Sequence, residues 1–284
     1  MKFSQRLRYI IWLAIALILV NMNCKADTIY DNEYNHYSGA KLNRLKVCGE
    51  RCSGTNFLYY LLHSNFPDLQ PTELLEYGQK HFLWWFGSTD FSKLTPLKYN
   101  SHAVDMVGSA DCLFVVVVRD PYDWLRSFFR SPHAVHNDLL NKGFSHFLTS
   151  PWKLIDHGDH PLDGSYREID NYNPFTNKPF LNVLELRRYK IQNYLTLREI
   201  VDNYVVVRYE HVRDNPKEFI DFIANKYRLH KYRIFSSITR LKGSHIPYVQ
   251  NQYFPFTESD LDFIEANIGW DIEEKVGYYP RKFN

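Results

Sequence analysis

The residues best suited to chemistry lie in the segment 49–56, which reads Gly-Glu-Arg-Cys-Ser-Gly-Thr-Asn. The segment follows a mostly apolar run, Leu45 to Cys48, and precedes a helix-like run, Phe57 to Leu62, so the order predicts a strand, a loop and a helix. Backbone N–H groups of such a loop converge on an anion together with the free N–H groups and positive dipole end of the helix. We therefore expect this loop to bind phosphate.

The spacing of Gly49 and Gly54 is that of a nucleotide P-loop, but the residues that follow differ. Thr55 and Asn56 stand where ATP- and GTP-binding loops carry a Lys and a Ser or Thr for the terminal phosphates and Mg²⁺. The pattern therefore predicts phosphate binding without metal-assisted phosphoryl transfer. A P-loop kinase is the alternative, and it is disfavoured because no clear Mg²⁺-binding carboxylate follows a strand.

A second candidate anion site follows the continuous apolar run Leu113 to Val118, which predicts a central parallel strand buried on both faces. The run ends at Arg119, and Pro121 suits the first position of a new helix, Tyr122 to Phe129. Ligands of open α/β sheets bind at the carboxyl ends of strands. Ser127 lies about two helical turns further on, so we expect Arg119 and Ser127 to face one crevice.

On these motifs the chain resembles the sulfotransferase family that uses 3′-phosphoadenosine 5′-phosphosulfate (PAPS). The loop 53–55 is similar to the family's 5′-phosphosulfate loop, and Arg119 with Ser127 is similar to its 3′-phosphate motif. The segment 205–210, Val-Val-Val-Arg-Tyr-Glu, resembles a family segment whose Tyr lies against the adenine. The resemblance spans roughly residues 46–278, and the stretch 131–180 matches no part of the family.

The resemblance implies a role for each matched residue. It implies that Arg51, Cys52, Ser53, Gly54, Thr55 and Asn56 surround the 5′-phosphosulfate, that Arg119 and Ser127 hold the 3′-phosphate, that Tyr209 lies against the adenine, and that Lys242 and Gly243 also contact the 3′-phosphate.

One position departs from the family. Family members carry a Lys or Arg directly before the matched Ser, where it stabilises the bridging oxygen as the sulfuryl group leaves, and here that position is Cys52. Arg51 is one residue earlier, and its long side chain can reach the same oxygen through charge-assisted hydrogen bonds. We predict that Arg51 replaces the missing cation. The alternatives are a surface residue at the mouth of the loop, and a catalytically silent relative that kept the nucleotide cleft.

Sulfuryl transfer also needs a base that accepts the proton of the attacking hydroxyl. His81 follows Lys80 at a place similar to the family's base segment, and it is the first candidate. Glu76 is second, because carbohydrate-acting members use a Glu near there, and His102 is third. The competing interpretation of His81 is a packed core residue beside aromatic neighbours.

Metal and nucleic acid are not expected as partners. His133 with His136, and His157 with His160, lack the partners of a known metal motif. The 34 basic residues nearly balance the 32 acidic ones, so no broad basic field favours nucleic acid.

Three cations, Arg187, Arg188 and Lys190, lie on the helix-like stretch 182–199. A solvated helix face is the default interpretation, and binding of the acceptor is the alternative.

The first 26 residues predict a targeting segment. Lys2, Arg6 and Arg8 precede an apolar run, Tyr9 to Val20, whose twelve residues suit a signal-peptide core better than a spanning helix. Cleavage near residues 24–26 gives a secreted domain. Without cleavage the run becomes a signal anchor that places the domain in the lumen, as in Golgi members of the family, and the membrane is then a partner only through this segment.

We expect residues 27–284 to form one domain, since 45% of the chain is hydrophobic and no linker or repeat divides it. The resemblance implies that this domain is sulfotransferase-like. We expect a three-layer α/β fold with a central parallel sheet. Cys48 and Cys112 are predicted to be buried free thiols. The expected function is sulfuryl transfer from PAPS to a hydroxyl or amine of a luminal or secreted acceptor. A carbohydrate is favoured, and a protein or small molecule remains open.

Overall fold

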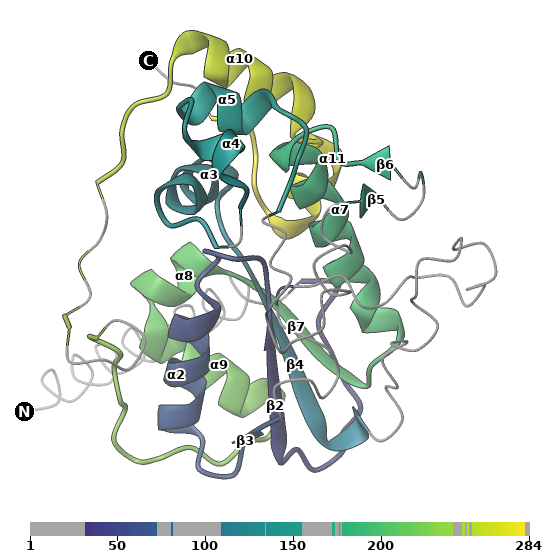
Figure 1. The fold of residues 1–284 in the computed structure, drawn as a ribbon. Helices are drawn as coiled ribbons and strands as arrows, with labels where there is room; N and C mark the ends of the chain where they lie inside the picture. Colours follow the sequence, from purple (N-terminus) through teal and green to yellow (C-terminus); the bar gives the residue numbers. More distant parts are fainter. Residues whose placement is uncertain are drawn as a thin grey trace, which may run out of the picture.

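The structure is a computed structural model. It describes residues 32–72, 81, 109–133, 135–154, 172–173, 176, 178–240, 246–247, 249 and 252–281. Within these ranges the chain has an α/β fold, in which a mixed sheet of five strands is packed between helices (Figure 1).

The sheet has the strand order β1-β7-β4-β2-β3. Its strands are β1 (His36–Tyr37), β7 (Asn203–Arg208), β4 (Cys112–Val118), β2 (Arg44–Cys48) and β3 (Gln70–Pro71). The four strands β7, β4, β2 and β3 are parallel, as expected of the central sheet, and β1 pairs with β7 in the antiparallel sense, so the sheet is mixed at this edge. An antiparallel edge strand needs no crossover helix, and two residues are too short to give a periodic signal. A separate antiparallel pair joins β5 (Tyr172–Asn173) and β6 (Lys178–Pro179).

The strand β4 is the centre of the sheet, as its apolar sequence predicts. Val115 pairs with Val47 of β2 on one side and with Val205 of β7 on the other, and all seven residues of β4 are buried. Successive side chains of a strand point to opposite faces. Val115 accordingly joins the hydrophobic cluster on one face, and Val116 joins the cluster on the other.

Helices cover both faces of the sheet. The helices α2 (Thr55–Asn65), α8 (Tyr209–Asp214) and α9 (Pro216–Lys226) pack on one face, and α7 (Val183–Thr196) and α11 (Trp270–Glu273) pack on the other (Figure 1). Two short 3₁₀ turns, η4 (Leu197–Glu199) and η6 (Glu274–Val276), extend the second group, and η3 (Ser109–Asp111) leads into β4. This arrangement is compatible with the predicted three-layer α/β domain.

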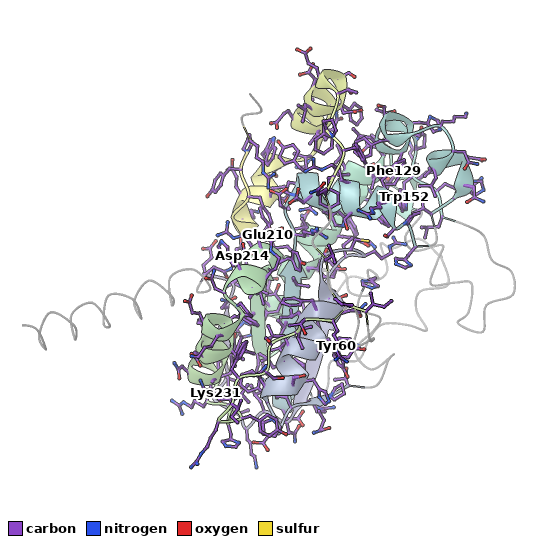
Figure 2. The ribbon with its side chains drawn as sticks, turned by 90° about the vertical axis from the view of Figure 1, so that its left-hand side faces the viewer. Tyr60, Phe129, Trp152, Glu210, Asp214 and Lys231 are labelled. Carbon is purple, nitrogen blue, oxygen red and sulfur yellow. The ribbon has the colours of Figure 1, made fainter. Side chains whose placement is uncertain are left out.

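A group of helices lies beyond the carboxyl ends of the parallel strands. It contains α3 (Pro121–Arg130), α4 (Asn137–Leu140), α5 (Phe144–Thr149) and α10 (Glu258–Asn267), and we call it the helical cap (Figure 1). Its core is aromatic, with Trp124, Phe128, Phe147 and Trp152 almost fully buried. Figure 2 shows Phe129 and Trp152 together in this region, away from Tyr60 on α2.

Local sequence explains where the main helices begin. Asp120 caps α3 by accepting a hydrogen bond from the Asp123 N–H, and Pro121 takes the first helical position. Thr257 and Asp260 form a reciprocal capping box at the start of α10. The predicted helix start at Pro121 is thus confirmed.

The predictions about the cysteine thiols and about the N-terminal targeting segment have different outcomes. Cys48 and Cys112 are buried, as expected, and neither forms a disulfide with another described cysteine. The targeting segment 1–26 lies outside the described residues, so it stays a prediction. In the part of the chain that the structure describes, no helix combines the length and apolar character needed to cross a membrane.

Candidate functional site

The loop between β2 and α2, residues 49–54, lies tightly against its neighbours, and we call it the β2–α2 loop. Gly49 and Gly54 have φ angles of 154° and 98°. A Cβ at Gly49 would lie 2.4 Å from the Val117 main-chain oxygen, and a Cβ at Gly54 would lie 2.3 Å from Cδ2 of Tyr209. Only glycine tolerates such approaches at these φ values. The two glycines therefore hold the loop against the end of β4 and the ring of Tyr209.

The helix α2 begins at Thr55, immediately after this loop. Among the described residues, no side chain caps α2 and its first turn contains no acidic residue. In contrast, α3, α7 and α10 each have a side-chain cap. The positive end of the α2 dipole therefore faces the loop without an acidic side chain in the first turn of the helix.

Arg119 and Ser127 come together as their spacing predicts. Arg119 directly follows β4, and its Nη1 donates to the Ser127 Oγ at 3.1 Å and to the Cys52 main-chain oxygen at 2.9 Å. Ser127 is 8% exposed on α3. One guanidinium thus joins the β2–α2 loop to the first helix of the cap.

The guanidinium of Arg119 is held by neutral groups among the described residues. In the described part of the chain it forms no ion pair with a carboxylate, and its buried Nε has no hydrogen-bond partner. The guanidinium carbon lies 4.9 Å from the centre of the Tyr209 ring, which holds the cation by a cation–π contact. Its Nη2 donates to the Tyr253 hydroxyl at 2.7 Å. A cation held this way suits an anionic ligand.

The main chain at Arg119 is fixed by a buried ion pair. Arg187 is 2% exposed and bonds Glu273 through two contacts, Nε to Oε1 at 2.5 Å and Nη2 to Oε2 at 2.8 Å. Its Nη2 also donates to the Arg119 main-chain oxygen at 2.7 Å. The default prediction of a solvated cationic face is wrong for Arg187 and for Lys190, which is 1% exposed, and it holds for the exposed Arg188.

Arg51 is buried in the helical cap and is not a surface residue. It is 5% exposed, its Nε lies 3.0 Å from Glu50 Oε1, and its Nη1 donates to the His133 main-chain oxygen at 3.1 Å. The guanidinium also lies over the rings of Phe128 and Trp152. The surface alternative is therefore wrong. Because Glu50 balances this charge, the role of Arg51 as the loop cation stays a prediction.

Glu50 connects the loop to α7 by a second ion pair. Burial alone would raise the pKa of Glu50, but the nearby charges of Lys190 and Arg51 lower it to about 2. The Lys190 Nζ lies 2.5 Å from Glu50 Oε2. A carboxylate with two cationic neighbours stays ionised, so it holds both side chains in place.

His81, the first candidate base, lies against the same loop. Its Nδ1 is 2.7 Å from the Gly49 main-chain oxygen, and its own main-chain oxygen accepts a hydrogen bond from Lys190 Nζ at 2.7 Å. A carbonyl oxygen only accepts hydrogen bonds, so Nδ1 carries the proton in this contact. In the neutral ring the Nε2 is then the nitrogen that can accept a proton.

The remaining predicted site residues differ in what the structure says about them. Tyr209 is 4% exposed, with its ring against Gly54, Arg119 and Phe57, so its contact with an adenine stays a prediction. Burial raises the pKa of the Cys52 thiol, which donates weakly to the Ser131 main-chain oxygen. Four further candidates lie outside the described residues, namely Glu76, His102, Lys242 and Gly243.

Sequence reasoning assigned no role in the site to Glu50 or Tyr253, and it did not foresee the buried positions of Arg187 and Lys190. A signal existed for Lys190, which lies four residues after Leu186 and four before Tyr194, so it shares a helix face with two buried residues. Tyr253 has no local signal, because the residue that it contacts is 134 positions earlier in the chain.

Comparisons with known proteins do not place the chain in a family. No family model matches it, and the search of curated proteins found no match. Within the described ranges, no group of three or more His, Cys, Asp or Glu side chains is arranged to hold a metal ion.

Proposed function

We propose that this protein is a sulfotransferase, which moves a sulfuryl group from PAPS to a hydroxyl or amine of a luminal or secreted acceptor, with a carbohydrate favoured. The observation that carries the proposal is the contact of Arg119 with Ser127 beside the β2–α2 loop and the uncapped start of α2. Two elements of different chemistry, a helix N-terminus and a guanidinium without a carboxylate partner in the described residues, thus lie next to each other, joined by the hydrogen bond from Arg119 to the Cys52 main-chain oxygen.

This pair of anion sites suits a ligand with two anionic ends. PAPS has a phosphosulfate on its 5′ side and a separate phosphate on its 3′ side. In the proposal, the β2–α2 loop acts as a P-loop-like cradle whose N–H groups hold the 5′ end, with Ser53, Thr55 and Asn56 around it. Arg119 and Ser127 hold the 3′-phosphate. A nucleoside monophosphate would leave one of these two sites empty.

The proposed reaction follows from the groups beside the loop. The acceptor oxygen attacks the sulfur in line, and the bond from sulfur to the bridging oxygen breaks. His81 Nε2 takes the acceptor proton, because Nδ1 is committed to the Gly49 carbonyl. The electron pair of the broken bond stays on the bridging oxygen, which leaves as the 5′-phosphate of adenosine 3′,5′-bisphosphate. Loop N–H groups stabilise that charge, and Arg51 is the proposed cation.

One observation favours a second candidate, a nucleotide-binding relative without catalysis. Arg51 is buried, paired with Glu50 and stacked on aromatic rings. A cation satisfied in this way has less charge to offer a leaving oxygen than a free one. The kinase alternative receives no such support, since Thr55 and Asn56 replace the residues that hold Mg²⁺ and phosphate.

Two experiments test the proposal in order. Adenosine 3′,5′-bisphosphate should raise the melting temperature far more than AMP or ATP does, because only it has both phosphates in the required places. Equal shifts would refute the proposed donor. Transfer of labelled sulfate from PAPS onto a panel of glycans and peptides then separates an enzyme from a silent relative. Turnover should survive EDTA, and complete loss that Mg²⁺ restores would favour the kinase.

A further inference from the structure

A segment just before α10 reaches across to the candidate site. Residues 252–257, which we call the strap, form no helix or strand, and they run beside α3 and α5 in the helical cap. Phe254 packs its ring against Phe144 at a centroid distance of 5.1 Å, and Phe256 packs against the same ring at 5.5 Å. These contacts anchor the strap, and they place Tyr253 beside Arg119.

Arg126 of α3 holds the strap from the other side. Its Nη1 donates to the Phe254 main-chain oxygen at 3.1 Å, and its guanidinium lies 5.0 Å from the Tyr253 ring centre. Its charge is paired with Asp123, where Nη2 lies 2.7 Å from Oδ1. Arg126 is therefore engaged in positioning Tyr253, whereas Arg119 forms no ion pair with a described carboxylate.

Among the described residues, the Tyr253 hydroxyl accepts a hydrogen bond but donates none. Its oxygen accepts from Arg119 Nη2 at 2.7 Å, and its own proton finds no acceptor among the described residues. Arg119 Nε is likewise a buried donor without a partner in that part of the chain. Within the part of the chain that the structure describes, donors thus exceed acceptors here, and a phosphate, with several strong acceptor oxygens and a negative charge, corrects that imbalance.

We infer that Tyr253 is a further binding residue of the proposed donor site and donates its hydroxyl proton to the phosphate that Arg119 holds. The inference rests on the proposed function, in which this phosphate is the 3′-phosphate of PAPS. Tyr253 would then help to distinguish nucleotides that carry a 3′-phosphate from those that do not. Its aromatic ring, held by Arg126, fixes where the hydroxyl lies.

The test compares two ligands on three proteins by isothermal titration calorimetry. The ligands are adenosine 3′,5′-bisphosphate and AMP, and the proteins are the wild type, Tyr253→Phe and the control Tyr232→Phe. Tyr232 is 51% exposed, and its main-chain N–H bonds the Asn65 carbonyl at the far end of α2, so its hydroxyl is remote from the loop. Tyr253→Phe should lose about tenfold or more in affinity for the bisphosphate and keep its affinity for AMP.

A second variant tests the positioning role of Arg126. Arg126→Gln should weaken bisphosphate binding in the wild-type background, because the strap loses its anchor. In the Tyr253→Phe background, Arg126→Gln should cause little further loss of bisphosphate affinity, since the hydroxyl that Arg126 positions is already gone. Additive losses in the double variant would show that Arg126 acts on the ligand by another route, and would overturn this arrangement.

Other outcomes would also overturn the inference. Unchanged bisphosphate affinity of Tyr253→Phe would show that the hydroxyl does not contact the ligand. If Tyr253→Phe loses equal affinity for the bisphosphate and for AMP, the role of Tyr253 is structural and not specific to the 3′-phosphate. If Tyr253→Phe binds the bisphosphate more tightly than the wild type does, the Tyr253 hydroxyl competes with the phosphate for Arg119. If the wild type itself does not prefer the bisphosphate to AMP, the proposed donor is wrong and the inference falls with it. If the wild type prefers the bisphosphate and Tyr253→Phe binds it with the same affinity as the wild type, the inference alone is wrong.

Discussion

The Lys190 Nζ lies 2.5 Å from Glu50 Oε2, which ties the middle of α7 to the β2–α2 loop across the end of the sheet. Both side chains are almost fully buried. Replacing one partner leaves the other as an uncompensated buried charge, so Lys190→Met should cost about 3–5 kcal/mol of unfolding free energy. The double variant Lys190→Met, Glu50→Gln should recover part of that loss, as measured by urea unfolding. A single variant as stable as the wild type would contradict the pair.

The same pair predicts how stability depends on pH. The pKa of Glu50 is lowered from its ordinary value of 4.5 to about 2 in the folded protein. The unfolded chain therefore takes up the proton first as the pH falls, so stability is present above pH 4.5 and is lost as the pH falls toward 2. The loss attributable to this group is about 3 kcal/mol. In Glu50→Gln, urea unfolding between pH 2 and 5 should lack this component; an unchanged pH profile would exclude it.

The parts of the site that follow from local rules were predictable. The strand before Arg119 is continuous and apolar, Pro121 marks the helix start, and helical geometry then fixes the position of Ser127. Lys190 and Arg187 were not predicted as buried, because their partners Glu50 and Glu273 lie on distant segments that the fold brings together. A charged residue is predicted to be exposed to solvent unless its partner can be identified from the sequence.

Gly54 gives a test of the loop's contact with Tyr209. Gly54→Ala places a methyl group 2.3 Å from a Tyr209 ring carbon at a φ of 98°, so either the ring or the loop must move. We expect a loss of stability of about 2–4 kcal/mol, from strain and overpacking together, and a clear loss of affinity for adenosine 3′,5′-bisphosphate.

The matched control is Gly143→Ala. Gly143 has a similar φ of 91°, but a Cβ there meets no atom within 4 Å. Its ψ of 178° makes this a backbone conformation that glycine alone adopts readily, so the variant should lose about 1–3 kcal/mol from backbone strain without overpacking, and it should bind the nucleotide normally. Equal effects of the two variants on stability and binding would show that the contact with Tyr209 does not matter.

His81 is tested by separating rate from stability. His81→Asn removes the ring nitrogen that is proposed to accept the proton, while the Asn amide can still donate a hydrogen bond near Gly49. We expect a loss in kcat of roughly a hundredfold or more, with donor affinity and melting temperature nearly unchanged. His230→Asn, at an exposed residue remote from the loop, is the control. Normal turnover would move the role to Glu76 and then to His102, whereas a large fall in melting temperature would identify a core residue.

The contacts of Arg51 count against its proposed role as the loop cation, because Glu50 and two aromatic rings already hold its guanidinium. If Arg51 nevertheless stabilises the leaving oxygen, Arg51→Ala should lower kcat by about tenfold to a hundredfold, the scale of one electrostatic contact in a transition state. Cys52→Lys places an ammonium at the position where the resembled family carries its cation, and the φ of 64° at Cys52 is no worse for Lys than for Cys. In the Arg51→Ala background it should therefore restore part of kcat without restoring stability, as measured by steady-state kinetics and thermal unfolding. If Arg51→Ala lowers only the melting temperature, and Cys52→Lys alone raises kcat, the native loop lacks the cation and Arg51 serves to hold Glu50.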